Sequence, residues 1–349
     1  MPGKLNEHKG VNARNGVAPD VAPFDDQSAP LFGPRRICVI VCGMHRTGTS
    51  AVSRLINLLG ADIAKDVEPP KEDNIRGFWE PREIVRIHNN LLEALDSSSA
   101  DPLPLPPDWL QSPFAERALR ELTGVVESEF ADSRLFTVKD PRLARLLPLW
   151  FKLLDDLSIR AVVVIPFRHP SEVAASLEKR DRMAPGTAML LYLESYLQAE
   201  LASRGRRRCF VSYDQLLADW RQLERKLTDQ LDVRLPQASA RLLAEVEHFL
   251  SPDLRHHWHN RGELRGMTDA PPIMAELFDI LLKAEITDDG GHLHKTFDDL
   301  SKRVDDEMRL FREFAIAERK KVLTVERSAS WRLTAPLRWV NSNVLRTIL

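Results

Sequence analysis

Four short runs of apolar residues recur along the chain and predict β-strands. They are RICVIVC at 36–42, RLFTVK at 134–139, RAVVVIPF at 160–167 and RCFVSY at 208–213. Their apolar residues follow one another without alternating with polar ones, as in parallel strands that are buried on both faces. Helical patterns lie between the runs. The sequence therefore predicts an α/β fold, with a central parallel sheet flanked by crossover helices.

The helical patterns have the period of amphipathic helices. SAVSRLINLLG at 50–60 places Val52, Leu55, Ile56 and Leu59 on one face and ends at Gly60. RLARLLPLWFKLLDDL follows the second apolar run, and SEVAASLEKR follows the third. Each apolar run is thus followed by a segment that can cross over the sheet.

Changes in composition divide the chain into three parts. Residues 1–36 are polar and rich in Gly, Pro, Asn and Asp, which predicts a disordered leader. Residues 37–296 hold the four apolar runs and form the expected α/β domain. From 297 onward the pattern is that of a charged amphipathic helix, so residues 297–349 are expected to form a helical, basic C-terminal extension.

Composition narrows the class of protein. The net charge of the 349 residues is −2, which does not indicate a nucleic-acid-binding protein. Three cysteines are too few for a disulfide framework and favour a reducing compartment. We see neither a signal-peptide pattern nor a run of about 20 apolar residues that could cross a bilayer. We therefore expect a cytoplasmic protein.

The first apolar run leads into a turn that resembles a phosphate-binding loop. Gly43 and Gly48 stand at the spacing of a P-loop, but no lysine follows the second glycine. A loop from a buried strand to a helix N-terminus presents unpaired backbone N–H groups to an anion. A cation and hydroxyl donors accompany them: Arg46, Thr47, Thr49 and Ser50. The alternative is an ordinary tight turn; the missing lysine suggests an anion that is transferred without a metal.

A second strand end repeats this pattern. In PFRHPSEVAASLEKR at 166–180, Arg168 ends the third apolar run and Pro170 stands where a helix can begin. Ser176 lies about two turns further along that helix. An ordinary strand–turn–helix with a solvated arginine is the alternative interpretation.

Together the two segments resemble the PAPS-dependent sulfotransferases. The family's 5′-phosphosulfate motif, (K/R)-S-G-T-T, is matched by the five residues from Arg46 to Ser50. Its 3′-phosphate motif, R-x-P-x-x-x-x-x-S, is matched by Arg168, Pro170 and Ser176. The resemblance spans residues 37–260 and implies a P-loop-like three-layer fold. It also implies PAPS (3′-phosphoadenosine 5′-phosphosulfate) as the sulfuryl donor and no metal.

The resemblance also assigns site residues. NIRGFWEPREIVRIHN at 74–89 is similar to the acceptor-side segment of bacterial carbohydrate-type members, which implies Glu80 as the general base. VKDPR at 138–142 is similar to a stretch in tyrosylprotein-type members and implies that Lys139, with Arg46, supports the leaving group. The residues expected to bind the donor are Gly43, Arg46, Thr47, Gly48, Thr49, Ser50, Arg168, Ser176 and, near the adenine, Tyr213.

Each of these assignments has an alternative. Glu80 could be a surface carboxylate, with His88 as the next candidate base, and Lys139 could form a structural ion pair with Asp140. Asn74, Arg76 and Arg82 could touch an acceptor or belong to a solvated loop. The chain has no evident counterpart of the histidine base of cytosolic small-molecule members, nor of their C-terminal nucleotide clamp.

The segment RHHWHN at 255–260 invites a metal-site interpretation. His256, His257 and His259 have no cysteine or carboxylate ligand nearby in the sequence. We therefore predict no metal site, and a substrate or nucleotide contact is the alternative role for these histidines.

Two other functions compete with sulfuryl transfer. A nucleotide kinase would need Mg²⁺ and the loop lysine, and a non-catalytic nucleotide-binding module would bind the nucleotide without transfer. The acceptor is expected to be a hydroxyl on a saccharide. SASWRLTAPLR near the C-terminus resembles a segment of bacterial enzymes that build surface glycans, which suggests polysaccharide biosynthesis.

The C-terminal segment 319–349 has seven basic residues against one acidic residue, a net charge of +6. Tryptophan and aliphatic residues are interleaved with them, as in a helix that lies at the membrane interface. Two interpretations stay open: peripheral contact with the inner face of the membrane, or packing on the chain's own domain or on a second subunit.

Overall fold

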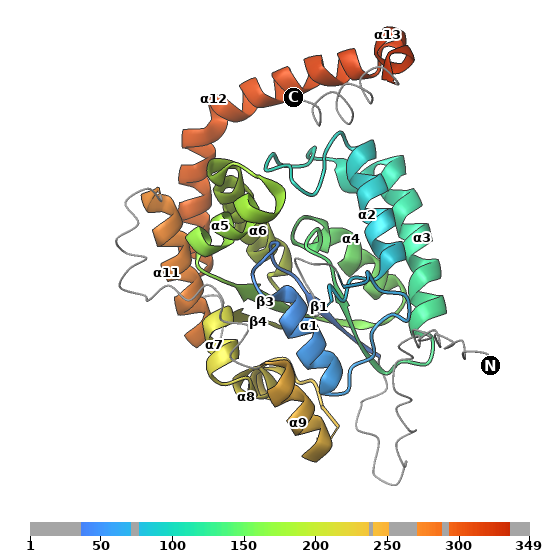
Figure 1. Ribbon diagram of the computed structural model, residues 1–349, viewed down its shortest axis with the longest axis vertical. Helices are drawn as coiled ribbons and strands as arrows, with labels where there is room; N and C mark the ends of the chain where they lie inside the picture. The colour runs from blue at the N-terminus through green and yellow to red at the C-terminus, as the bar shows by residue number, and fades with distance from the viewer. Residues whose placement is uncertain (1–35, 71–76, 237–239, 251–270, 288–292, 336–349) are drawn as a thin grey trace, which may run out of the picture. The chain divides into compact units, whose positions relative to one another are not determined.

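The computed structural model describes residues 36–70, 77–236, 240–250, 271–287 and 293–335 (Figure 1). Nearly all of the leader, Asn74 and Arg76, the histidines of 255–260 and the last residues of the tail lie outside these ranges. The predictions made for them stay predictions.

The four predicted strands are confirmed and form one parallel sheet. Their bounds are β1 Ile37–Val41, β2 Leu135–Lys139, β3 Arg160–Phe167 and β4 Arg208–Ser212, in the order β2-β1-β3-β4. The chain leaves β1 for β2 on one side and later adds β3 on the other side. The carboxyl end of β1 is therefore a topological switch point, where open α/β sheets bind ligands.

Helices connect the strands and continue the chain beyond them. Those between β1 and β4 are α1 Thr49–Leu58, α2 Arg82–Ala94, the 3₁₀ turn η1 Trp109–Gln111, α3 Pro113–Phe130, α4 Leu143–Asp156, α5 Pro170–Asp181 and α6 Pro185–Ser203. Those after β4 are α7 Tyr213–Ala218, α8 Arg221–Arg225, the π-helical turn η2 Lys226–Gln230, α9 Ala240–Phe249, α11 Pro272–Ile286, α12 His294–Glu326 and α13 Ala329–Leu333.

Two apolar clusters lie on opposite faces of the sheet. Alternate residues of β1 point to opposite faces because side chains alternate along a strand. Cys38 and Ile40 join the cluster covered by helices that include α2, α3, α4 and α6, whereas Val39 and Val41 join the one covered by α1, α7, α8 and α9. The predicted α/β fold, with helices on both faces of a parallel sheet, is thereby confirmed. All three cysteines are buried, and burial raises the pKa of each thiol.

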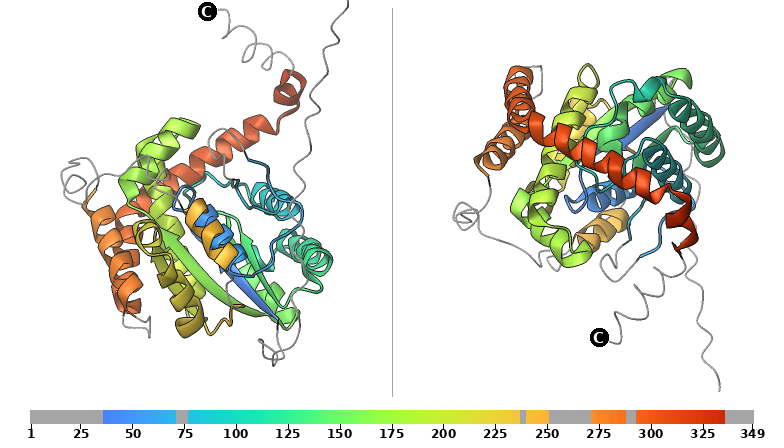
Figure 2. Two further views of the ribbon diagram at one scale, coloured as in Figure 1. Left: turned by 60° about the horizontal axis from the view of Figure 1, so that its bottom comes forward. Right: turned by 90° about the horizontal axis from the view of Figure 1, so that it is seen from above.

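The C-terminal helix α12 has 33 residues. Its first half buries Phe297, Leu300 and Val304 against the domain. The second half runs across to the loop that follows α2, where the Arg319 guanidinium donates to the carbonyl oxygen of Asp96 at 3.1 Å (Figure 2). None of the described helices combines the length and the apolar character that a bilayer crossing requires.

Candidate active site

The loop between β1 and α1 needs its two glycines. Gly48 has a φ of +92°, and a Cβ there would lie 2.4 Å from Cδ2 of Tyr213. A Cβ on Gly43 would lie 2.7 Å from the carbonyl oxygen of Pro166. The backbone can take this path only without side chains at these positions. This backbone path leads the loop to the N-terminus of α1, where the first N–H groups have no partner within the helix.

The hydroxyl groups of the loop divide into two kinds. Thr47 is buried, and its hydroxyl donates to the carbonyl oxygen of Met44 at 2.7 Å, so it holds the loop itself together. Ser50 faces the site: its hydroxyl accepts from the ammonium group of Lys139 at 3.1 Å and donates to the carbonyl oxygen of Phe78 at 3.2 Å. Ser50 thereby connects the loop to Lys139, one of the residues predicted for catalysis.

Lys139 and Glu80 are in direct contact. The ammonium nitrogen of Lys139 lies 2.5 Å from Oε1 of Glu80 and 3.0 Å from the carbonyl oxygen of Phe78. The Lys139 side chain is 2% exposed and that of Glu80 is 13% exposed. Glu80 is therefore not the surface carboxylate of the alternative interpretation. A cation and a carboxylate from separate segments meet beside the loop between β1 and α1, which has no lysine of its own.

Asp140 belongs to a different buried network. Its carboxylate lies 2.7 Å from the Arg142 guanidinium and 2.8 Å from Nδ1 of His88. Burial alone would raise the pKa of Asp140, but the charge of Arg142 and the hydrogen bond with His88 hold it well below its ordinary value. The Lys139 ammonium group instead contacts Glu80, the hydroxyl of Ser50 and the carbonyl oxygen of Phe78, so the alternative Lys139–Asp140 ion pair does not form.

His88 is unsuited to act as a base. The indole N–H of Trp150 donates to Nε2 of His88 at 2.8 Å, so the proton of the neutral ring is on Nδ1 and faces Asp140. The ring is fully buried. Both nitrogens are engaged in the core, which removes His88 as the next candidate base.

His45, in the same loop, has several positive side chains near it. His45 lies within electrostatic range of Arg180, Arg142 and Lys139. Burial, assisted by these charges, lowers the pKa of His45 to about 3. The imidazole is therefore neutral near pH 7, and the local positive charge resides on lysine and arginine.

The two predicted anion motifs meet in space. Nε of Arg46, in the loop after β1, donates to the hydroxyl of Ser176 in α5 at 2.9 Å. Arg168, at the end of β3, lies over the ring of Tyr213 with 5.2 Å between the guanidinium carbon and the ring centroid. Nε of Arg168 also donates to Glu172 at 2.5 Å. Residues 130 positions apart thus share one edge of the sheet.

The remaining predicted acceptor contact lies at the surface. Arg82, the first residue of α2, lies 3.3 Å from Asp66, and both side chains are exposed. Its position favours the solvated interpretation. Among the described residues, no group of three or more His, Cys, Asp or Glu side chains has the arrangement of a metal site.

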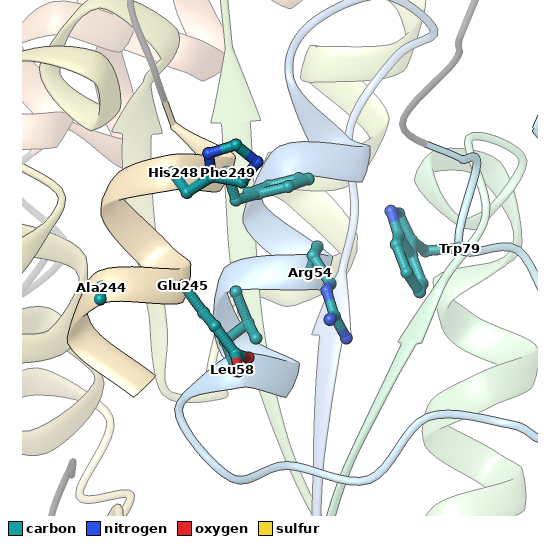
Figure 3. Close-up of a pocket in the computed structure, with 7 residues that line it drawn as sticks. All are labelled: Arg54, Leu58, Trp79, Ala244, Glu245, His248 and Phe249. Carbon is teal, nitrogen blue, oxygen red and sulfur yellow. The ribbon is translucent and has the colours of Figure 1, made fainter. Parts of the chain in front are cut away.

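A pocket that the sequence did not indicate lies between α1 and α9 (Figure 3). Its volume is about 620 Å³, and its lining residues are Arg54, Leu58, Trp79, Ala244, Glu245, His248 and Phe249. Ser50, Arg54 and Leu58 are spaced four apart and so lie on one face of α1. The pocket therefore begins about one helical turn beyond Ser50, on the same face of α1.

Trp79 connects this pocket to the candidate base. It directly precedes Glu80, and its φ of +58° is rare for a residue with a large side chain. The guanidinium carbon of Arg54 lies 4.6 Å from the Trp79 ring centroid, and burial lowers the pKa of Arg54. Within the described part of the chain, the buried indole N–H of Trp79 has no hydrogen-bond partner. An aromatic residue beside the predicted base was the only signal in the sequence for this pocket.

Comparisons with known proteins give distant similarities. No protein-family model and no curated protein matches the chain. Sulfotransferase STF1 from Mycobacterium tuberculosis is similar at 14% identity and a TM-score of 0.43, over 62% of this chain and 77% of that one. The sulfotransferase domain of the Synechococcus PCC 7002 olefin synthase is similar at 17% identity and a TM-score of 0.39, over 70% of this chain and 95% of that one. Because these sequence identities and TM-scores are low, the argument for a function depends on the geometry of the site.

Proposed function

We propose that the chain is a PAPS-dependent sulfotransferase that transfers a sulfuryl group to a hydroxyl of a saccharide acceptor. The observation that carries this proposal is the Lys139–Glu80 contact of 2.5 Å beside a phosphate loop that lacks its own lysine. A carboxylate can take the proton of a hydroxyl, and the adjacent cation can neutralise charge that develops on a leaving phosphate.

The shape of the loop supports a phosphate-containing donor. A Cβ on Gly43 would meet the carbonyl oxygen of Pro166 in β3, and a Cβ on Gly48 would meet the ring of Tyr213, so both positions require glycine. Such a loop at a helix N-terminus suits the 5′-phosphosulfate. Arg168 and Ser176 lie at the neighbouring strand end and suit the 3′-phosphate, since arginine binds phosphate through paired hydrogen bonds.

The pocket next to the loop suits the adenine of the same donor. Trp79 and Phe249 supply aromatic surface, and Arg54 supplies a guanidinium stacked on the indole. A purine gains from such stacking on aromatic and guanidinium planes. In this arrangement Tyr213 does not line the base pocket; it packs on Gly48 beneath Arg168 and shapes the phosphate site.

Transfer then proceeds as an in-line displacement. The acceptor oxygen forms a bond to sulfur while the bond from sulfur to the bridging phosphate oxygen breaks. Glu80 takes the hydroxyl proton, and the electron pair of the broken bond stays on the bridging oxygen. Lys139 and Arg46 stabilise the resulting negative charge, and Ser50 orients the Lys139 ammonium group.

A kinase would require an acidic residue for Mg²⁺ near the loop. Asp140 is the candidate at the end of β2, but Arg142 and His88 occupy its carboxylate inside the core. This arrangement favours sulfuryl transfer over the nucleotide kinase.

Calorimetry with adenosine 3′,5′-bisphosphate in the presence of a chelator tests the donor assignment. We expect a dissociation constant on the order of micromolar, because the two strand ends each bind one phosphate. Binding that depends strictly on a divalent metal ion would refute the assignment. Acceptor profiling with labelled PAPS against glycans, phenols and peptides would then identify the acceptor.

A further inference from the structure

The pocket between α1 and α9 has different polar groups at its two ends. In Figure 3 the indole nitrogen of Trp79 lies toward the start of α1, whereas the carboxylate of Glu245 lies beside Leu58 at the opposite end. Leu58 is eight residues beyond Ser50, which is about 12 Å along the helix axis. Glu245 therefore marks the end of the pocket that is farther from the loop between β1 and α1.

The walls of the pocket suit a flat, conjugated ring. Phe249 and Trp79 supply aromatic surface, and the Arg54 guanidinium carbon lies 4.6 Å from the Trp79 ring centroid. The volume of about 620 Å³ is within the range of small-molecule sites. Within the described part of the chain, the buried indole N–H of Trp79 lacks a hydrogen-bond partner, and such a donor costs free energy until an acceptor reaches it. The pocket therefore suits a ring-shaped ligand that carries acceptor atoms.

Glu245 places a hydrogen-bond acceptor at the far end. It lies on α9 four residues before Phe249, so the two side chains share the helix face that lines the pocket. Burial lowers the pKa of Arg54, and the negative charge of Glu245 opposes this shift, so the carboxylate lies within electrostatic range of Arg54. The oxygens of an ionised carboxylate accept hydrogen bonds and donate none. A polar ligand group that reaches this end must therefore be a donor.

An adenine nucleotide has its polar groups in the matching order. When its phosphates lie at the loop between β1 and α1, the exocyclic amino group of the base is the polar group farthest from them. This amino group is a donor, whereas the ring nitrogens are acceptors. A base stacked between Phe249 and the Arg54–Trp79 pair thus turns its amino group toward Glu245. Guanine and hypoxanthine carry a keto oxygen at the same ring position, which would place two acceptors opposite each other.

We propose that Glu245 selects adenine by accepting a hydrogen bond from the exocyclic amino group of the base. This inference rests on the proposed function and adds to it the residue that distinguishes adenine from keto purines. Specificity of this kind has two sources, the hydrogen bond to the correct base and the repulsion of the wrong one.

Calorimetry with a pair of ligands tests the contact directly. Adenosine 3′,5′-bisphosphate has the amino group, and purine-riboside 3′,5′-bisphosphate lacks it but is otherwise the same. We expect the full-length wild type to bind the adenosine ligand at least about fivefold more tightly, because the amino group donates to a charged acceptor. In Glu245→Ala, the two dissociation constants should agree to within about twofold. Glu245 is exposed, so this variant should fold as the wild type does.

Glu247→Ala is the matched control. Glu247 is an exposed residue of the same helix, with its carboxylate 3.9 Å from the Arg221 guanidinium, and it should keep the wild-type ratio of dissociation constants. If Glu245 served only to position Arg54, Glu245→Ala would weaken both ligands by the same factor. An unchanged ratio in Glu245→Ala therefore overturns the proposal.

Inosine 3′,5′-bisphosphate tests the discrimination against a keto oxygen. The wild type should bind it at least about tenfold more weakly than the adenosine ligand. Glu245→Gln should reduce this preference to within about threefold, because the amide can donate to the keto oxygen. Equal or tighter binding of the inosine ligand by the wild type would overturn the proposal. A wild type that binds none of these bisphosphates refutes the donor assignment as well, whereas binding with ratios that Glu245→Ala leaves unchanged removes only the role of Glu245.

Discussion

Glu80→Gln separates the proton-accepting role of Glu80 from its role in the fold. The substitution keeps the size and shape of the side chain, and the amide oxygen can still accept from the Lys139 ammonium group at the position of Oε1. The hydroxyl of Ser50 and the carbonyl oxygen of Phe78 remain as further partners of that ammonium group. The local geometry should therefore persist.

The expected magnitudes differ between stability and catalysis. An ionic acceptor becomes a neutral one, so the free energy of unfolding should fall by about 1–2 kcal/mol. Turnover should fall at least about 100-fold, because a positioned general base contributes about that factor or more. This corresponds to about 2.7 kcal/mol of lost transition-state stabilisation. Donor affinity should change by less than about threefold, since Glu80 is assigned to the acceptor.

The assay is single-turnover transfer from labelled PAPS, with donor affinity measured separately by calorimetry. Glu83→Gln is the matched control: Glu83 lies three residues away on α2 and forms an exposed ion pair with Arg86. This control should keep its turnover within about twofold of wild type. If Glu80→Gln also keeps its turnover within about fivefold, Glu80 is not the base, and the hydrogen bond from Trp150 prevents His88 from replacing it.

Three further substitutions test separate parts of the site. Arg168→Ala should weaken binding of adenosine 3′,5′-bisphosphate by about 2–4 kcal/mol in calorimetry, and unchanged affinity in a folded variant would remove Arg168 from the site. Trp79→Ala should weaken the same binding by about 1–3 kcal/mol but leave pyrophosphate binding unchanged, and equal losses for both ligands would contradict a base pocket. Asp140→Asn should lower stability at pH 7 by about 3 kcal/mol. Because the folded pKa of Asp140 is depressed, its contribution is present above about pH 4 and lost as the pH falls, so urea unfolding of the variant should depend less on pH below about 4 than unfolding of wild type. Equal pH dependence of the two proteins would contradict this role.

The sequence predicted the parts of the fold that local patterns determine. All four strands were found, and the helix predicted from 50 corresponds to α1 at Thr49–Leu58. Continuous apolar runs and glycine spacing carry this information, because they reflect burial on both faces and the path of the loop backbone. The Arg46–Ser176 contact was implied only indirectly, since both residues belong to strand-end motifs that a parallel sheet brings to one edge.

Side-chain contacts between distant segments could not be predicted in this way. Lys139 stands beside Asp140 in the sequence, yet it pairs with Glu80 because Asp140 turns into the core toward His88. The sequence left His88 as a candidate base, but Trp150, on another helix, donates a hydrogen bond to it. Which ion pairs and hydrogen bonds these side chains form depends on the groups that tertiary packing places next to them.

The pocket was missed for the same reason. Arg54 comes from α1, Trp79 from the segment before α2, and Phe249 from α9. No local pattern links these three segments. The pocket exists because α9 packs against the outer side of α1 while the turn at Gly77, with a φ of +90°, carries Trp79 back over Arg54.

Metal-free transfer of a sulfuryl group is the most direct measurement of the proposed activity. Purified full-length protein is incubated with labelled PAPS, a panel of saccharide acceptors and an excess of chelator. We expect label to appear on at least one acceptor, with adenosine 3′,5′-bisphosphate released in equal amount and the rate reduced at least about 100-fold in Glu80→Gln. Absence of transfer to any hydroxyl acceptor by a protein that binds the donor, or transfer that requires Mg²⁺, would contradict the assignment.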